Sequence, residues 1–191
     1  YGIEVDTHPP KVAYKETITG QAEGHHRHKK QSGGSGQFGE VFLRIEPVEE
    51  TNEELVNGLM FVDDTFGGSV PKQFLPAIEK GVRQVMQEGA IAGYPIQNIK
   101  VAVYDGKHHP VDSKEVAFVT AGKRAFVDAI KKAHPVLLEP FVKLEITIPS
   151  DAIGDISSDI SGRRGRIQGT DMMPGNQAVV FAEAPLSEMM T

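Results

Sequence analysis

The sequence predicts an α+β protein of two domains, because three features recur or change along its 191 residues. Short stretches alternate apolar and polar residues, as half-buried strands do. Longer stretches repeat apolar residues at helical spacing. Pro135 and Pro140 then bracket a short segment, after which a new strand, helix, strand, strand pattern begins. We therefore expect one domain up to residue 134 and a second from Pro135 onward.

The first predicted domain holds three alternating strands, at residues 11–19, 40–48 and 97–104. The segment between the first two, residues 21–39, is polar and rich in Gly and His. We expect it to be a long exposed loop, of a length that is usually functional or disordered inside a compact domain. Asp105 and Gly106 are expected to open a second loop, which continues to Pro110.

Two helices complete this domain. The first is predicted over 71–88, with Pro71 in the first turn, where its missing N–H would be unpaired anyway. The second begins at Asp112, whose carboxylate and that of Glu115 fit a capping box. A stripe formed by Val116, Val119, Phe126 and Ile130 predicts its buried face. Strands with crossover helices are typical of an α/β or α+β domain.

The second predicted domain has strands at 143–148, 166–172 and 177–184 and a helix around 153–160. Acidic residues stand near the start of this helix and two arginines near its end, as the helix dipole favours. Residues 185–191 resemble the opening of a further helix. This order matches most of a split βαβ fold.

Composition excludes several classes of protein. The formal net charge of −6 argues against coating nucleic acid by bulk positive potential, so any RNA contact must be local. The absence of cysteine excludes disulfides and thiolate chemistry. Apolar runs fall far short of the roughly 20 residues that a membrane helix needs. Because the chain starts at Tyr1 and ends in an opening helix, we expect a segment cut from a longer protein.

Gly34, Gly36 and Gly39 form a literal G-x-G-x-x-G. Dinucleotide binding requires a strand before these glycines and a helix after them, whereas here a polar loop precedes and a strand follows. No G-x-x-x-x-G-K-[ST] phosphate loop occurs either. We therefore interpret the glycines as a flexible hairpin tip that allows close backbone approach, which a surface fitting an RNA groove would also need.

Five of the seven histidines fall in the two predicted loops: His25, His26, His28, His108 and His109. Neutral imidazoles could bind a metal if the loops meet, since zinc often takes three histidines and a water. Their spacing matches no metal motif, so solvated residues or RNA contacts are the favoured alternatives, and no metal site is predicted.

Arg27, Lys29 and Lys30 make the first loop a basic island in an acidic chain. A charged loop of this kind is commonly just solvated. If the two loops are neighbours, however, they form one cationic, glycine-rich tip that could contact phosphates without reading bases. We predict this tip as the functional site.

No catalytic residue is predicted. Asp63 and Asp64 are adjacent, so in an extended chain their carboxylates point to opposite faces. Ser32 or Ser35 with a loop histidine could imitate a nucleophile and base, but a mobile loop holds such geometry poorly.

Seven motifs occur in one order across nearly the whole chain, and in that order they resemble elongation factor G. They are 30–39 (KQSGGSGQFG), 67–71 (GGSVP), 93–95 (GYP), 111–113 (VDS), 134–140 (HPVLLEP), 162–165 (GRRG) and 184–188 (APLSE). The resemblance implies that residues 1–9 are a remnant of a preceding domain. It implies that residues 10–134 form the fourth domain, an elongated α/β arm with a left-handed βαβ crossover. Residues 135–191 would form an incomplete, ferredoxin-like fifth domain.

The resemblance also implies a function. In that family the arm enters the decoding region of the small ribosomal subunit and contacts rRNA, tRNA and mRNA during translocation, which is coupled to GTP hydrolysis. GTP and magnesium would bind in a G domain outside this segment, so the segment itself would be noncatalytic and without a cofactor. We expect a cytoplasmic monomer that does not contact membranes. Carried over by position, the ribosome-binding tip would comprise Gly33, Gly34, Ser35, Gly36, Gln37 and His109.

Three positions depart from the usual family tip. A basic residue often stands at Ser35, a Tyr at Phe38, and an aromatic–His–acid run at residues 108–110. These departures resemble divergent elongation factor G-like paralogues. Ribosome recycling and tetracycline-type ribosome protection, which use the same arm, therefore remain alternatives to translocation, and a His-rich metal-binding module is an alternative of another class.

Overall fold

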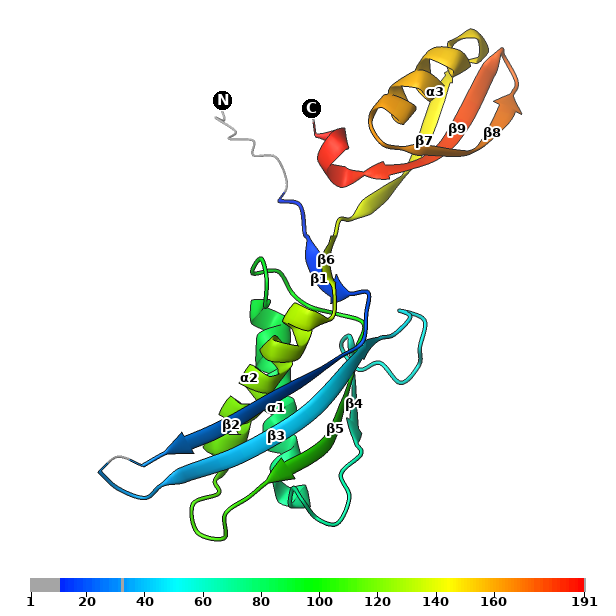
Figure 1. Cartoon of the computed structure of the whole chain (residues 1–191). Coiled ribbons are helices and arrows are strands. Elements are labelled where there is room, and N and C mark those ends of the chain that lie inside the picture. Colours follow the sequence, from blue (N-terminus) through cyan, green and yellow to red (C-terminus); the bar gives the residue numbers. More distant parts are fainter. Residues whose placement is uncertain (1–10, 32, 191) are drawn as a thin grey trace, which may run out of the picture. The chain divides into compact units, whose positions relative to one another are not determined.

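The computed structural model describes residues 11–31 and 33–190, and contacts within it divide the chain into two units (Figure 1). The first unit is Lys15–Leu138, and the second contains residues 139–190. The predicted remnant at residues 1–9 lies outside the described residues. Residues 135–138 belong to the first unit, although the sequence places the boundary before Pro135, because they form a strand that pairs with the first strand of that unit.

The first unit contains a four-stranded sheet and a separate two-stranded ribbon. The ribbon pairs β1 (Lys15–Ile18) with β6 (Pro135–Leu138). The sheet has the order β2-β3-β5-β4, made of β2 (Ala22–Lys30), β3 (Gln37–Pro47), β5 (Ile99–Lys107) and β4 (Leu59–Asp63). The pair β4–β5 is parallel, and the other pairs of this sheet are antiparallel.

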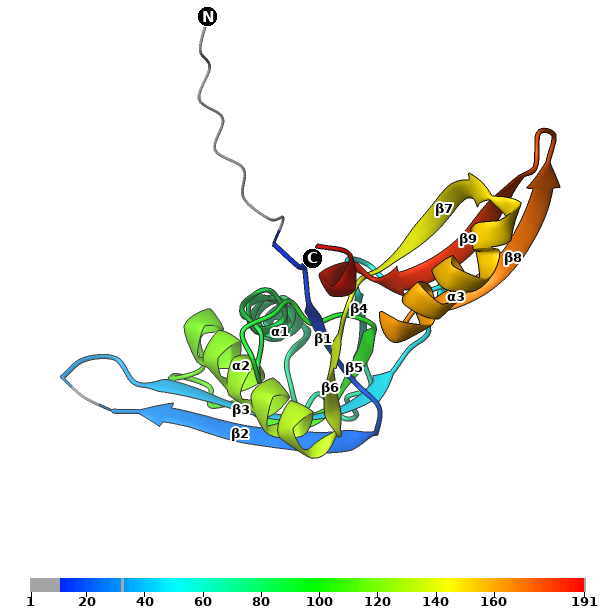
Figure 2. The ribbon, with the colours of Figure 1, turned by 90° about the horizontal axis from the view of Figure 1, so that it is seen from above.

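Two helices cover one face of this sheet: α1 (Leu75–Glu88), preceded by the short η1 (Lys72–Phe74), and α2 (Glu115–Lys132) (Figure 2). Apolar side chains of β3 and β5 pack against them in a continuous core that includes Leu43, Val103, Ile78, Phe118 and Phe126. The opposite face of the sheet is left open by both helices (Figure 2).

The connection from β4 through α1 to β5 has the less common hand. In Figure 1 both strands run downward, β5 lies to the left of β4, and α1 lies behind the sheet, as Figure 2 makes clear. The crossover is therefore left-handed, whereas about 98% of such connections are right-handed. This confirms the predicted α/β arm with a left-handed βαβ crossover.

The predicted long loop at 21–39 is wrong, because residues 22–30 form strand β2. One face of β2 packs on α2: a Cβ added at Gly24 would lie 2.0 Å from the carbonyl oxygen of Ala125. The other face is open to solvent, so it carries His and charged residues and lacks the apolar alternation that marks a half-buried strand. Of the described residues, only 31 and 33–36 remain as the loop between β2 and β3.

Three smaller predictions about the first unit also fail. Residues 105–107 extend β5 and do not begin a loop. The residue that precedes α2 is Lys114, so Asp112 lies two residues too early to cap the helix, and no side-chain cap is present. The Asp112 carbonyl oxygen instead accepts the Phe38 N–H of the neighbouring hairpin. Of the predicted stripe, Val116 is half exposed and therefore wrong, whereas Phe126 and Ile130 are buried and Val119 packs against the core. Phe118 and several small residues complete the buried face of α2.

The second unit has the order that the sequence predicts. It consists of β7 (Phe141–Pro149), η2 (Ser150–Ala152), α3 (Ile153–Gly162), β8 (Arg166–Met173), β9 (Gln177–Pro185) and η3 (Leu186–Met189). The strands pair antiparallel as β7-β9-β8, and α3 packs on them through a small core centred on Ile160, Val180 and Ala182. This is the ferredoxin-like arrangement that was predicted. Within the described residues, no helix is both long and apolar enough to cross a membrane.

Candidate nucleic-acid interface

The structure brings the two tip loops together. The loop at 31–36 joins β2 to β3, and the loop at 108–114 joins β5 to α2. The Phe38 N–H donates to the carbonyl oxygen of Asp112 (2.9 Å), and the Ser113 hydroxyl donates to the carbonyl oxygen of Phe38 (3.0 Å). The Lys114 ammonium also donates to the Ser35 hydroxyl. Because these bonds join backbone as well as side chains, the two loops form one end of the first unit.

The three glycines of the first loop have different local roles. Gly33 has a φ of +60°, which a residue with a side chain rarely adopts. Gly36 approaches the second loop so closely that a Cβ there would lie 2.8 Å from the Asp112 carboxylate. At Gly34 an added Cβ would meet no described atom within 4 Å. The loop therefore offers bare backbone at residues 33 and 34 and tight packing at residue 36.

The three basic residues that were predicted to form one cluster lie on strand β2. Because successive side chains of a strand point to opposite faces of the sheet, they do not all share one face. Arg27 and Lys29 share the open face of the sheet, opposite the face on which Gly24 meets α2, whereas Lys30 alternates to the other side. The Arg27 guanidinium lies over the ring of Phe38, 5.3 Å from its centroid.

Sequence reasoning missed two residues of this surface, Phe38 and Lys107. Both lie inside segments that were singled out, and Phe38 was noted as a departure from the family tip, but neither was predicted as a contact residue. Only strand pairing shows which way their side chains face. On β3, Glu40 pairs with Arg27 on one side and with Lys107 on the other. Directly opposed residues share a face, so Lys107 joins Arg27 on the open face.

These residues line a pocket of about 260 Å³, called the tip pocket below. Its basic or imidazole-bearing residues are Arg27, Lys29, Lys107, His108 and His109. The remaining lining residues are Gln31, Gln37, Phe38 and Asp112. Three Lys and Arg side chains thus face one carboxylate in this pocket, in a chain whose formal net charge is −6. Five predicted tip residues line the pocket: Arg27, Lys29, Gln37, His108 and His109. The other predicted residues do not line it: Gly33, Gly34, Ser35, Gly36 and Lys30.

His109 is fixed in orientation by its own loop. Its Nδ1 accepts the backbone N–H groups of Asp112 (3.1 Å) and Val111 (3.3 Å), and its own N–H donates to the Ser113 hydroxyl (2.8 Å). The neutral ring must therefore carry its proton on Nε2, which remains available as a donor. Half of the His109 side chain is exposed.

The histidines of β2 have separate partners. His25 stacks on Phe42 and its Nε2 lies 2.7 Å from the carboxylate of Glu40, while His28 Nε2 lies 3.0 Å from the Gln37 amide oxygen. Burial lowers the pKa of His26, and the nearby Arg124 lowers it further. Within residues 11–31 and 33–190, no three His, Asp or Glu side chains are arranged to hold a metal ion.

The adjacent carboxylates Asp63 and Asp64 serve different partners. Asp63 accepts the N–H and the hydroxyl of Thr65, and these bonds hold its pKa below the usual value. Asp64 instead pairs with Arg44. Because the two carboxylates bind different partners, Asp63 and Asp64 do not form an acid–base pair.

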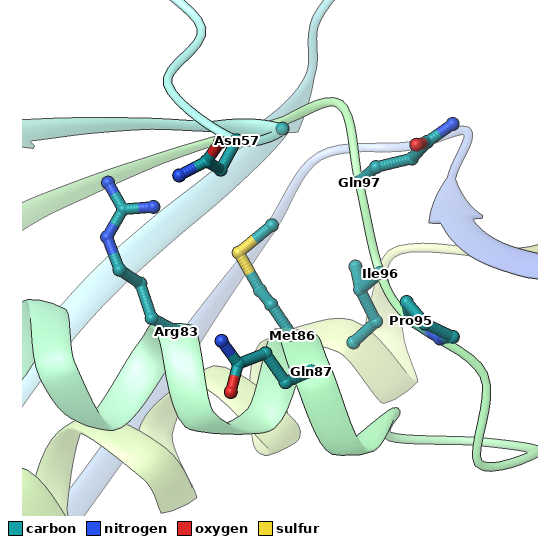
Figure 3. Close-up of a pocket in the computed structure, with 8 residues that line it drawn as sticks. Asn57, Arg83, Met86, Gln87, Pro95, Ile96 and Gln97 are labelled. Carbon is teal, nitrogen blue, oxygen red and sulfur yellow. The ribbon is translucent and has the colours of Figure 1, made fainter.

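A second pocket, of about 390 Å³, lies at the other end of the first unit, beside the end of α1 and the start of β5 (Figure 3). Met86 lies between Arg83 and Ile96 in this view. The Arg83 guanidinium donates to Glu79 and to the Val56 carbonyl oxygen, so the cation of this pocket is already paired. The tip pocket is therefore the better candidate for binding an anionic polymer.

Comparison with known proteins gives consistent matches to one family. Residues 10–134 match the family described as elongation factor G, domain IV, and residues 136–191 match elongation factor G C-terminus. Elongation factor G of Aquifex pyrophilus is 48% identical over 189 residues, which is 99% of this chain and 26% of that protein. Elongation factor G of Petrotoga mobilis is 47% identical over 190 residues, with 99% and 27% covered.

A solved structure agrees with these matches. A crystal structure from Thermus thermophilus superposes with a TM-score of 0.83 and 42% identity, covering 100% of this chain and 27% of that one. The chain thus spans about a quarter of the length of the relatives that it matches.

Proposed function

Because this chain belongs to the elongation factor G family, we propose that it is the arm with which a translational factor contacts RNA in the decoding region of the small ribosomal subunit. The contact surface is the tip formed by residues 31–36 and 108–114. The observation that carries the proposal is the pair of hydrogen bonds between Phe38 and the second loop, which makes one surface of two distant segments.

The tip acts by occupying space and by charge. A loop held on a sheet and two packed helices can block the return of tRNA and mRNA after they move, because a rigid support resists displacement. The bare backbone at Gly33 and Gly34 allows close approach to RNA. Hydrolysis of GTP, bound with magnesium elsewhere in a full-length factor, is coupled to the movement, and the arm itself performs no chemistry.

The charge distribution favours local over general RNA binding. An acidic chain repels nucleic acid at long range, whereas Arg27, Lys29 and Lys107 can neutralise phosphates at the tip. We infer a factor that binds the ribosome in the cytoplasm as a monomer, with its affinity for RNA concentrated in this one region.

The test is single-turnover translocation by a full-length factor that carries this segment. Gly33→Ala with Gly34→Ala, and separately His109→Ala, should slow translocation while leaving ribosome-stimulated GTP hydrolysis unchanged. Gly154→Ala in α3 is the matched control, since an added Cβ there meets no described atom within 4 Å. Translocation at the parental rate in both tip variants would remove the proposed role.

The two alternative functions are distinguished by other assays on the full-length factor. A recycling factor would split post-termination ribosomes into subunits, and a protection factor would release tetracycline from the ribosome. In either case the tip variants would not change the rate of translocation. No observation favours either over translocation. The metal-binding alternative is tested by titrating the chain with zinc in a calorimeter. The absence of binding heat would rule that alternative out.

A further inference from the structure

We propose that the tip pocket binds one unstacked RNA nucleotide, with the base against the Arg27–Phe38 pair and the phosphate between Lys29 and Lys107. The choice of RNA as the ligand rests on the proposed function. The size of the ligand, one nucleotide with an exposed base, rests on the geometry of the pocket alone.

The pairing of three strands places the charged groups around an aromatic centre. Lys29 of β2 is directly opposite Phe38 of β3, and Lys107 of β5 is opposite Glu40, two residues further along β3. Neighbouring strands lie about 4.8 Å apart, so cations on β2 and β5 flank β3 at a spacing that their long side chains can close. A phosphate can therefore reach both lysines while its base lies over β3.

The Arg27–Phe38 contact supplies the stacking surface. Glu40 is directly opposite Arg27, yet its carboxylate bonds His25, and its second oxygen has no hydrogen-bond partner among the described residues. The guanidinium lies over the ring of Phe38 instead. Single-stranded bases stack on aromatic rings and on arginine, whereas the bases of a duplex are already stacked on each other.

The remaining cations of the open face are neutralised. Arg44 is paired with Asp64, and Lys100 is paired with Glu46 at 2.7 Å. In the part of the chain that the structure describes, Arg27, Lys29 and Lys107 have no such ion pair. The unpaired positive charge of this face is therefore gathered at the tip pocket, which limits the phosphate contact to this end.

The pocket volume sets the size of the ligand. About 260 Å³ lies just below the range of about 300–1,000 Å³ that is typical of small-molecule sites. This space accommodates one base with part of its sugar and phosphate. The groove of a duplex requires a wider surface, so a duplex should contact only the rim.

The experiment is an amide-resonance titration of the isotope-labelled 191-residue chain with four probes. The probes are a short single-stranded ribonucleotide, the same strand with abasic positions, a short RNA duplex and inorganic phosphate. The single strand should shift amide signals of the tip pocket saturably, and the abasic strand and the duplex should bind about tenfold more weakly.

Variants separate the two parts of the ligand. Phe38→Leu, which keeps apolar volume, should abolish the preference for the base-containing strand without changing affinity for the abasic one. Lys29→Gln and Lys107→Gln should weaken both strands, while Lys100→Gln, on the same sheet face but paired with Glu46, should weaken neither. The spectrum of each variant reports whether its fold is retained.

Equal affinity for the abasic and intact strands, or tighter binding of the duplex, would overturn the nucleotide proposal, as would phosphate alone saturating the same signals at equal concentration. These outcomes leave the proposed ribosomal function standing, because a tip that contacts only RNA backbone could still support translocation. Failure of the proposed function would instead appear in the translocation assay.

Discussion

Replacing Glu16 with glutamine should destabilise the first unit strongly, although the two side chains have nearly the same shape. Glu16 is 2% exposed, and its two carboxylate oxygens accept backbone N–H groups from Ala90, Ile91, Ala92 and Tyr94, at 2.7–3.2 Å for the shortest bond of each. Through these bonds β1 holds the segment between α1 and β5. In glutamine one oxygen becomes an NH₂ group, which faces N–H donors and cannot accept from them.

The magnitude follows from the number of bonds. A hydrogen bond to a charged group contributes about 1.5–3 kcal/mol, and about half of the set would be lost. We expect a loss of about 3 kcal/mol and a melting temperature lowered by about 10 °C. The control is Glu46→Gln, which weakens a partly exposed pair with Lys100 and should cost about 1 kcal/mol or less.

The same contact predicts a pH dependence. Burial by itself raises the pKa of Glu16, but the four N–H groups outweigh it, and the pKa in the folded chain is lowered. The stabilisation is therefore fully present above the ordinary pKa of a glutamate, which applies to the unfolded chain, and is lost as pH falls through the lowered pKa of Glu16 in the folded chain. Thermal unfolding followed by circular dichroism should show the gap between the parent and Glu16→Gln closing in acid. A melting temperature within about 2 °C of the parent at pH 7 would refute the reasoning.

Two further substitutions test the packing that positions the tip. Gly24→Ala should destabilise the chain by about 1–3 kcal/mol in chemical denaturation, because its Cβ would meet the backbone of α2 at 2.0 Å, whereas Gly154→Ala should cause no loss. Ser113→Ala removes bonds to the carbonyl oxygen of Phe38 and from the N–H of His109, so it should cost about 1–2 kcal/mol. It should also speed amide hydrogen exchange at Phe38 and His109, and unchanged exchange there would show that the hydroxyl does not join the loops.

Much of the fold could be predicted because local and tertiary preferences agree. Helix α1 has a continuous apolar stripe and ends before Gly89, as these signals predict. Its predicted start at Pro71 is four residues too early, because residues 72–74 form the short 3-10 helix η1 and α1 begins at Leu75. The second unit alternates in the same unambiguous way. Its sheet has one covered face, so every second residue of β7 is partly buried.

Strand β2 could not be predicted because its partners lie far away in the sequence. Its covered face meets α2 through Gly24, which has no side chain to contribute to a pattern, and through a half-buried His26. Its open face is polar. The face of the sheet on which Phe38 and Lys107 lie depends on the register of β3 with β2 and β5. This register cannot be predicted from the local sequence of one strand.

The most direct test of a two-loop RNA-binding tip is photocrosslinking from a full-length factor stalled on ribosomes. A photoreactive residue is placed in turn at Ser35 and at His109. As a control, it is placed at Gln87, which lines the second pocket at the other end of the first unit. We predict RNA crosslinks from both tip positions to the same neighbourhood of the decoding region, and none from Gln87. Crosslinks to RNA from Gln87, with none from Ser35 and His109, would contradict the account.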